Sequence, residues 1–172
     1  KQNQLSDDTN DSDVNQTTFR SDPTHYMLSG DVNLTLDAGV YEPVTIGDFV
    51  WEDINANGQQ DSGEDGIAGV LVTLIIDGTL YPEINTTTDS NGHYEFNTTR
   101  DLKPDSNYSV EFKNPDTRYV FTVQNATDSN DTNDSDANAS GQSVTATPTM
   151  YSGESNISLD AGMYIPAKLG NR

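Results

Sequence analysis

The sequence contains no cysteine, and only 8 of its 172 residues are lysine or arginine, against 28 aspartate and glutamate residues. The lack of cysteine excludes disulfide bonds, thiolate nucleophiles and cysteine-ligated zinc. The formal net charge of −20 repels nucleic-acid phosphates and anionic lipids, so neither is an expected partner. The longest apolar run covers residues 70–76, well short of the roughly 18 residues of a membrane-spanning helix. The composition therefore predicts that this segment does not insert into a membrane.

The sequence repeats itself at an offset of 123 residues. Residues 8–13 recur unchanged as residues 131–136, and residues 36–39 recur as 159–162, with no gap between the two copies. A unit of this length has the size of an independently folding domain rather than of a solenoid repeat. We therefore expect a tandem array, in which residues 1–43 are the C-terminal part of a preceding repeat, residues 44–166 are one complete repeat and residues 167–172 begin the next.

The complete repeat shows an all-β pattern. Short apolar or alternating runs are bounded by Gly, Asn, Asp and Pro, and no stretch keeps a helical period. Strands are expected at 44–51, 69–77, 94–96, 108–112, 119–123, 144–151 and 157–164. About seven strands at this spacing predict a β-sandwich, with tight turns at Asp77-Gly78 and Asn91-Gly92. Aromatic residues on the strand alternation are expected in the core, namely Phe49, Trp51, Tyr94, Phe96, Phe112 and Phe121.

Residues 53–64 match the twelve-position calcium-binding loop. Oxygen side chains occupy positions 1, 3, 5 and 9, glycine at position 6 permits the sharp turn, position 7 contributes its carbonyl, and glutamate at position 12 can bind through both oxygens. Because the flanking residues are strand-like, we expect a structural Ca²⁺ rather than a sensor that opens a helix pair. The alternative is an Asn- and Gly-rich surface turn. The predicted ligands are Asp53, Asn55, Asn57, Gln59, Asp61 and Glu64.

A second acidic cluster, residues 128–136, contains four carboxylates within nine residues. Such a run is often a solvated loop. Its core hexapeptide is nevertheless unchanged in both copies, and the carboxylates would repel each other unless a cation bound them. Asp37 and Asp160, in the repeated Leu-Asp-Ala-Gly motif, are unexplained by strand alternation and are further candidates. The predicted ligands of a second Ca²⁺ are Asp131, Asn133, Asp134 and Asp136.

Six segments together resemble the calcium-binding B domains of serine-aspartate repeat surface proteins. They are residues 46–51, 53–64, 66–70, 88–96, 133–136 and 159–164. The resemblance implies an immunoglobulin-like sandwich of the prealbumin type, used in tandem as a calcium-stiffened stalk, with Ca²⁺ bound at both predicted sites. Related collagen-adhesin B domains carry a Lys-Asn isopeptide crosslink. None of the four lysines, Lys1, Lys103, Lys113 and Lys168, lies in the first strands of the repeat, so no such crosslink is expected.

Eleven of the 17 asparagines begin an Asn-X-Ser/Thr sequon, many more than chance placement of Ser and Thr would give. This excess predicts covalent N-glycans, and with low lysine and high aspartate it fits an archaeal envelope protein better than a Gram-positive one. Part of the excess is also expected if these residue types simply crowd polar loops. Asn130 and Asn133 compete with the calcium site. The predicted glycosylation sites are Asn15, Asn33, Asn85, Asn97, Asn107, Asn125, Asn138 and Asn156.

The function predicted from these features is a non-catalytic segment of an extracellular, cell-surface stalk, with neighbouring repeats as its partners and lateral or end-to-end self-association. Two alternatives remain: a filament subunit joined by β-strand addition, and a carbohydrate- or protein-binding module. A carboxylate-dependent glycosidase is not expected, because no pair of acids stands out. The two histidines, His25 and His93, do not resemble a general base, since His25 is replaced by Pro148 in the second copy and His93 lies in a turn.

Overall fold

The computed structural model describes residues 12–15, 17–21, 27–127, 130–142 and 146–170. It divides into two compact units, residues 1–41 and residues 42–172. The boundary lies two residues before the predicted repeat boundary, and the repeat assignment itself stays a prediction. The described residues contain no helix long and apolar enough to cross a membrane.

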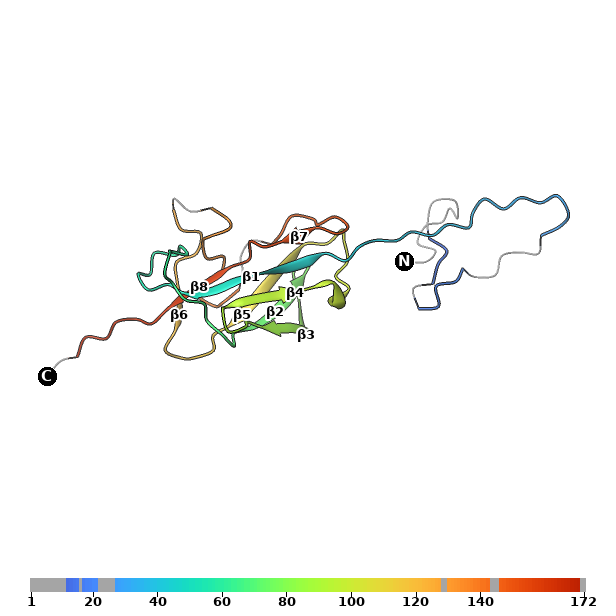
Figure 1. Ribbon diagram of the computed structural model, residues 1–172. Helices are drawn as coiled ribbons and strands as arrows, with labels where there is room; N and C mark the ends of the chain where they lie inside the picture. The colour runs from blue at the N-terminus through green and yellow to red at the C-terminus, as the bar shows by residue number, and fades with distance from the viewer. Residues whose placement is uncertain (1–11, 16, 22–26, 128–129, 143–145, 171–172) are drawn as a thin grey trace. The chain divides into compact units, whose positions relative to one another are not determined.

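The second unit is a sandwich of two β-sheets (Figure 1). Its elements are β1 (Thr45–Glu52), β2 (Leu71–Ile76), β3 (Thr79–Thr87), β4 (His93–Phe96), the 3₁₀ turn η1 (Thr98–Arg100), β5 (Tyr108–Lys113), β6 (Val120–Phe121), β7 (Ser155–Asn156) and β8 (Ala161–Tyr164). One sheet has the order β4-β1-β8-β6, with β7 also paired to β1, and the other has the order β3-β2-β5. The predicted all-β, immunoglobulin-like sandwich is confirmed.

The first and last strands of the sandwich are parallel neighbours. Val50, Trp51 and Glu52 of β1 face Ala161, Gly162 and Met163 of β8. The first residues of β1 pair instead with β7. Because β1 and β8 run in the same direction, the chain begins the sandwich at one end and leaves it at the other (Figure 1).

The core lies between the two sheets and includes four of the six predicted aromatic residues. Tyr94, Phe96 and Phe112 are buried in it, and Phe121 is partly buried against it. Phe49 and Trp51 are also buried, but they lie outside this cluster and stack on each other, with ring centroids 6.4 Å apart. Edge-to-face contacts join Tyr94 to Phe96 and to Phe112, with ring centroids 6.1 and 5.7 Å apart. The prediction that these aromatic side chains are buried is therefore confirmed for five of the six, and four of the six lie in or against the core between the sheets.

The sequence pattern missed β3 and the two-residue strand β7, and it predicted one strand that is not formed. The burial pattern of β3 is mostly exposed, and it contains Pro82, which edge strands and bulges tolerate. Its pairing with β2 shifts between Thr73 and Leu74. The strand expected at 144–151 is not formed by its described residues 146–151, although Thr147 and Met150 are buried there. In the predicted strand 157–164, only residues 161–164 form a strand.

Two glycines allow a tight turn and a close approach between backbone segments. Gly78 follows Asp77 in the β2–β3 turn, and both have positive φ, +78° and +48°, as expected for a type I′ hairpin turn. Gly66 packs against the loop before β4, where a Cβ would stand 1.8 Å from the carbonyl oxygen of Asn91. The backbone of Gly66 also forms a bridge with Trp51, so the residues just after the 53–64 loop lie against β1.

Candidate calcium-binding end of the sandwich

The predicted calcium loop, residues 53–64, follows directly on β1. The N–H of Glu52 donates to the carbonyl of Asp65 (2.9 Å), so the loop closes at its base. Asp53 is completely buried. Its carboxylate accepts hydrogen bonds from the N–H groups of Asn57 (3.2 Å) and Gly58 (2.7 Å) and from the hydroxyl of Thr122 (2.5 Å). Asp53 therefore fixes the shape of the loop from inside.

The other predicted ligands of this loop meet around Asp61. The side-chain amides of Asn55 and Asn57 donate to the same carboxylate oxygen of Asp61, at 2.8 and 2.9 Å. The carboxylate of Glu64 accepts from the N–H groups of Ile54 (2.8 Å) and Asp61 (3.0 Å). Positions 3, 5, 9 and 12 are thus turned toward the inside of the loop, as a calcium loop requires.

Gln59 points away from this group. Its side-chain amide donates to the carbonyl of Thr127 (3.0 Å), and its backbone forms a bridge with Asp134. The prediction that position 7 contributes its carbonyl rather than its side chain agrees with this orientation, and the Ca²⁺ itself stays a prediction.

The second cluster lies against the first loop (Figure 1). Gln60 N–H donates to the carbonyl of Asn133 (2.8 Å), and Ser135 N–H donates to the carbonyl of Gly58 (3.1 Å). Asp134 and Asp136 are buried, whereas Asp131 is exposed. The structure therefore brings both predicted sites together at the end of the sandwich where β1 ends. Asp128, which belongs to the same acidic run, lies outside the described residues.

Asp136 also belongs to a group of three aspartates with Asp160, which is buried, and Asp48, which is half-buried. Asp160 N–H donates to the carboxylate of Asp136 (2.8 Å), and Phe49 N–H donates to the carboxylate of Asp160 (3.2 Å). The carboxyl groups of Asp48 and Asp160 lie within hydrogen-bonding range of each other. The Oδ2 atom of Asp160 is buried and has no hydrogen-bond partner among the described residues.

Burial shifts the protonation of all three aspartates. Loss of water contact, reinforced by the charge of Asp48, raises the pKa of Asp160 to about 10. The same loss of hydration raises the pKa of Asp136 to about 7 and that of Asp48 to about 6, and the charges of Asp131 and Asp134 add to the shift of Asp136. Without a cation, the group therefore holds protons near neutral pH.

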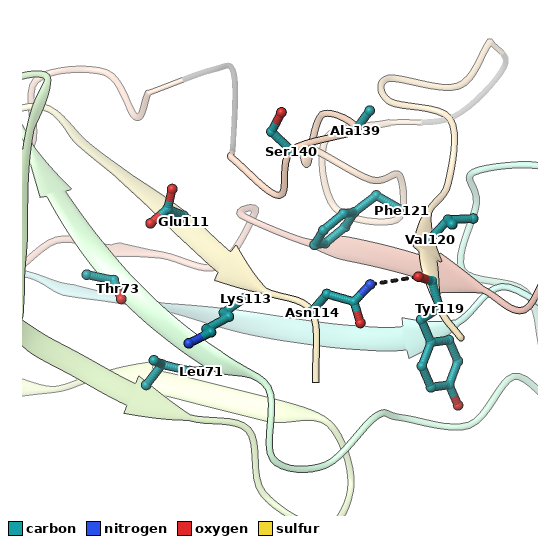
Figure 2. Close-up of a pocket in the computed structure, with 10 residues that line it drawn as sticks. All are labelled: Leu71, Thr73, Glu111, Lys113, Asn114, Tyr119, Val120, Phe121, Ala139 and Ser140. Carbon is teal, nitrogen blue, oxygen red and sulfur yellow. Dashed lines mark hydrogen bonds between the residues drawn. The ribbon is translucent and has the colours of Figure 1, made fainter. Parts of the chain in front are cut away.

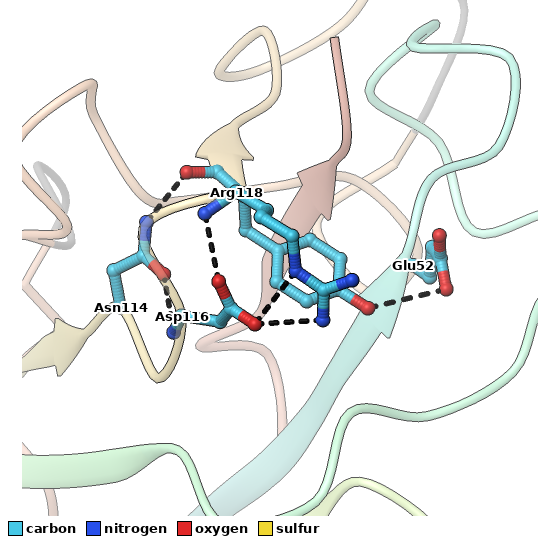
Figure 3. Close-up of polar contacts among 5 residues, drawn as sticks. Glu52, Asn114, Asp116 and Arg118 are labelled. Atoms are coloured by element: carbon cyan, nitrogen blue, oxygen red, sulfur yellow. Dashed lines mark hydrogen bonds and ion pairs between the residues drawn. The ribbon is translucent and has the colours of Figure 1, made fainter.

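Sequence reasoning missed two contributors to this end of the molecule. Asp48 carried a detectable signal, since it is a charged residue within an otherwise apolar strand. Thr122 carried none, because a threonine in a strand is ordinary. The two ion pairs of the described residues lie elsewhere: Lys103 with Asp101 and Arg118 with Asp116 (Figure 3), all exposed or half-buried. Neither pair neutralises the acidic group.

The oxygen chemistry of the first loop fits Ca²⁺, a hard cation that takes carboxylate, amide and backbone oxygens together. A half-turn of the Asn55 and Asn57 amides would bring oxygen, rather than nitrogen, toward Asp61. As the loop stands, its carboxylates accept hydrogen bonds from its own N–H groups. Among the described residues, no group of three or more His, Cys, Asp or Glu side chains is arranged to hold a metal ion.

A groove of about 730 Å³ lies away from these loops. It is lined by outward-facing side chains of β2 and β5, including Glu111 and Lys113, and by Tyr119 and Phe121 (Figure 2). The side-chain amide of Asn114 donates to the carbonyl of Tyr119 (2.7 Å) at one side of it. Such a groove is relevant to the alternative function as a carbohydrate- or protein-binding module. That function stays a prediction.

The comparison with known proteins agrees with the fold. The SdrD B-like domain model matches residues 44–163. The chain belongs to the SdrD B-like domain family. Serine-aspartate repeat-containing protein D from Staphylococcus aureus (strain Newman) is 39% identical over 148 residues, which are 84% of this chain and 10% of that protein. For serine-aspartate repeat-containing protein F from Staphylococcus epidermidis, the identity is 36% over 165 residues, 95% of this chain and 9% of that protein.

The SdrD B-like chain thus spans about one tenth of the length of these curated relatives. Its similarity to a crystal structure of the shaft pilin SpaA from Lactobacillus rhamnosus GG has a TM-score of 0.37 at 11% identity, over 75% of this chain and 52% of that one. Both curated relatives come from staphylococci, so the archaeal origin suggested by the sequons has no support.

Proposed function

We propose that this SdrD B-like domain is a non-catalytic structural repeat of a secreted or cell-surface protein, stiffened by Ca²⁺ in a stalk or filament. The observation that carries the proposal is the convergence of Asn55, Asn57 and Asp61 inside a closed loop, with the second acidic cluster packed on it. An acidic surface that needs a divalent cation suits the outside of a cell, where extracellular modules bind Ca²⁺ at about 10⁻⁴ to 10⁻³ M.

The direction of the strands supports a rod of repeats. Because β1 and β8 are parallel neighbours, successive domains would follow each other end to end. Pro43 and Pro166 stand just outside the two ends of the sandwich, where they restrict the backbone and favour extended joints. A pull on the two ends loads the β1–β8 hydrogen bonds together rather than one at a time, which suits a load-bearing segment.

At the first site, Asp53, Asn55, Asn57, Gln59, Asp61 and Glu64 would hold the ion, Gln59 through its backbone carbonyl. At the second, Asp131, Asn133, Asp134 and Asp136 would do so. A bound Ca²⁺ supplies positive charge that offsets the repulsion between the carboxylates. Asp53 and Thr122 orient the loop, and the backbone bonds from Gln60 and Ser135 join the two sites. The two loops would then stiffen as one unit.

Calcium titration of the full chain and of Glu64→Gln tests the proposal. The wild-type chain should bind two or more Ca²⁺ ions. Glu64→Gln should lose one of them and keep the other, because Glu64 belongs only to the first loop. Mg²⁺ at the same concentration is the control, and we expect weaker binding because Mg²⁺ demands stricter geometry. A wild-type chain that binds no Ca²⁺ would refute the proposed function.

We also propose that the repeat carries N-glycans. In four sequons, the asparagine side-chain oxygen accepts hydrogen bonds from both the N–H and the hydroxyl of the Ser or Thr two positions on: Asn33, Asn97, Asn130 and Asn156. Asn97 is exposed, and its side-chain nitrogen donates no hydrogen bond to a described residue. The side-chain nitrogen of Asn107, by contrast, donates to the carbonyl of Thr147 (3.0 Å).

Glycopeptide mapping of the protein from its native cells should therefore find a glycan on Asn97, and a lower occupancy of Asn107. The reason is that the Asn97 side-chain nitrogen, where a glycan attaches, makes no hydrogen bond to a described residue, whereas a glycan at Asn107 must be accommodated beside the bond from this residue, just before β5, to residue 147. A peptide with unmodified Asn97 would contradict this prediction without affecting the calcium proposal.

A further inference from the structure

The groove of about 730 Å³ lies on the face of the β3-β2-β5 sheet that points away from the core. Leu71 and Thr73 of β2 line it, and their partners Lys113 and Glu111 on β5 line it as well (Figure 2). Val72, between the two β2 residues, is buried in the core, so Leu71 and Thr73 point outward. Thr73 is nevertheless only 8% exposed, which places it on the floor of the groove.

The sequon at Asn85 lies on the same outer face of this sheet. Asn85 of β3 is the cross-strand partner of Thr73, and Thr87 is the partner of Leu71. Directly paired residues have their side chains on the same side of a sheet, about 5 Å apart. Ile84, the residue before Asn85, packs against the core, as this alternation requires. Both defining residues of the sequon therefore stand beside the floor of the groove.

The groove has the size and the lining of a carbohydrate site. Its volume of about 730 Å³ lies within the range of pockets that hold small organic ligands, about 300 to 1,000 Å³. Tyr119 and Phe121 contribute aromatic surface, against which the C–H groups of a sugar ring can pack. Glu111 and Lys113 can accept and donate hydrogen bonds to sugar hydroxyls. Apolar surface with a few polar groups suits a sugar better than it suits bare solvent.

We propose that a glycan attached to Asn85 folds across β2 and occupies this groove. This placement rests on the proposal that the repeat carries N-glycans, and it names the surface that one of them contacts. Two strand spacings, about 10 Å, separate Asn85 from Glu111, so the first sugars of the glycan reach the groove. The glycan covers Leu71 and the aromatic side chains, which are otherwise open to water.

Attachment at Asn85 keeps the contacts of the folded strand. The side-chain nitrogen of Asn85 donates to the carbonyl of Pro82 (2.7 Å), an exposed contact within β3. Attachment forms a bond between this nitrogen and the anomeric carbon of the first sugar. The bond from that carbon to the diphosphate of the sugar donor breaks, and the leaving diphosphate takes up the proton that the nitrogen loses. The amide has two N–H groups, so the remaining one can still donate to Pro82.

A second sequon, at Asn138, borders the groove, since Ala139 and Ser140 line it. The side-chain oxygen of Asn138 accepts hydrogen bonds from the N–H groups of Ser140 (2.8 Å) and Gln142 (3.2 Å). The Asn138 side chain is therefore turned toward its own loop. The side chain of Asn85 shares a face with the floor of the groove, so we assign the glycan in the groove to Asn85.

The experiment measures how fast Lys113 reacts with an amine-acetylating reagent in the full chain produced in its native cells. Lys113 is exposed and lines the groove, so a glycan seated there shields it. Thr87→Ala removes the sequon and keeps Asn85, and in this variant Lys113 should be acetylated several times faster than in the wild type. Lys168, which is exposed and is not part of the groove, is the internal reference and should react equally in both.

Three further variants serve as matched controls. Thr87→Ser keeps the sequon and should keep the protection, which separates the effect of the glycan from that of the Thr87 side chain. Thr99→Ala removes the sequon at Asn97, and it should leave the protection unchanged. Ser140→Ala removes the sequon at Asn138, with the same expected result.

Glycopeptide mapping of the same samples separates the two proposals. Glycans at other sequons but none on Asn85 would overturn the placement and leave the N-glycan proposal standing. The same holds for an Asn85 glycan that leaves Lys113 unprotected, and for protection that is lost in Ser140→Ala rather than in Thr87→Ala. A protein without any N-glycan would overturn both proposals.

Discussion

Replacing Asp53 by alanine should lower the free energy of unfolding by about 3 to 5 kcal/mol, even with Ca²⁺ removed. The Asp53 carboxylate is fully buried and accepts hydrogen bonds from Asn57, Gly58 and Thr122. The truncation leaves Gly58 N–H and the Thr122 hydroxyl without this acceptor, whereas Asn57 N–H keeps the side-chain oxygen of Asn55 (2.9 Å). The loop also loses the group that shapes it. Urea unfolding of the metal-free chain, followed by Trp51 fluorescence, measures the change.

Asp61→Ala is the matched control for this substitution. Asp61 is exposed and belongs to the same loop, so its loss should change the metal-free stability by less than about 1 kcal/mol. Both variants should bind less Ca²⁺ than the wild type. Equal metal-free stabilities for the two variants would show that Asp53 does not have the structural role assigned to it.

The metal-free chain should lose stability as the pH rises from 4 to 8, and Asp160→Asn should reduce that loss. The pKa values of Asp48, Asp136 and Asp160 are raised above the ordinary 3.8, to about 6, 7 and 10. A carboxyl group whose pKa is raised by folding binds its proton more tightly in the folded state. Its contribution is therefore fully present below pH 4 and disappears as the pH rises through the folded pKa.

Asp160→Asn removes the group with the largest shift and replaces it by an amide that can donate to Asp48. We expect this variant to be more stable than the wild type by about 2 kcal/mol or more at pH 8, and nearly equal to it at pH 4. Chemical denaturation at both pH values in the presence of a chelator measures the difference. Asp105→Asn, at an exposed position, controls for the change in net charge. A variant that is less stable than the wild type at pH 8 would contradict the proposed burial of mutually repelling carboxyl groups.

Much of the fold could be predicted because the main strands are short apolar or alternating runs bounded by turn residues. Val50, Val72 and Val110 repeat the apolar positions of β1, β2 and β5, and all are buried. β3 could not be predicted in this way, since it lies at an edge, is largely exposed and contains Pro82. Apolar spacing predicts a strand that includes residues 146–151, and this prediction is wrong. They bury Met150 without joining a sheet, and apolar spacing alone does not distinguish the two cases.

The candidate site was predictable where its residues are close in sequence. Position-by-position matching placed Asp53, Asn57 and Asp61 in one loop, and the structure confirms that they contact one another. The partners of Asp136 and Asp53 lie far away along the chain, at Asp160 and Thr122. Only the fold brings them together, and a single sequence carries no signal for such pairs beyond an unexplained charge in a strand.

The most direct test of the central claim is thermal unfolding of the full chain with excess Ca²⁺ and then with a chelator, together with elemental analysis of bound calcium. At free Ca²⁺ of about one hundred times the dissociation constant, each site should add about 2.7 kcal/mol to the free energy of unfolding. We expect a rise in melting temperature of many degrees with two or more ions per chain. An unchanged melting temperature and no bound calcium would contradict the account of a calcium-stiffened repeat.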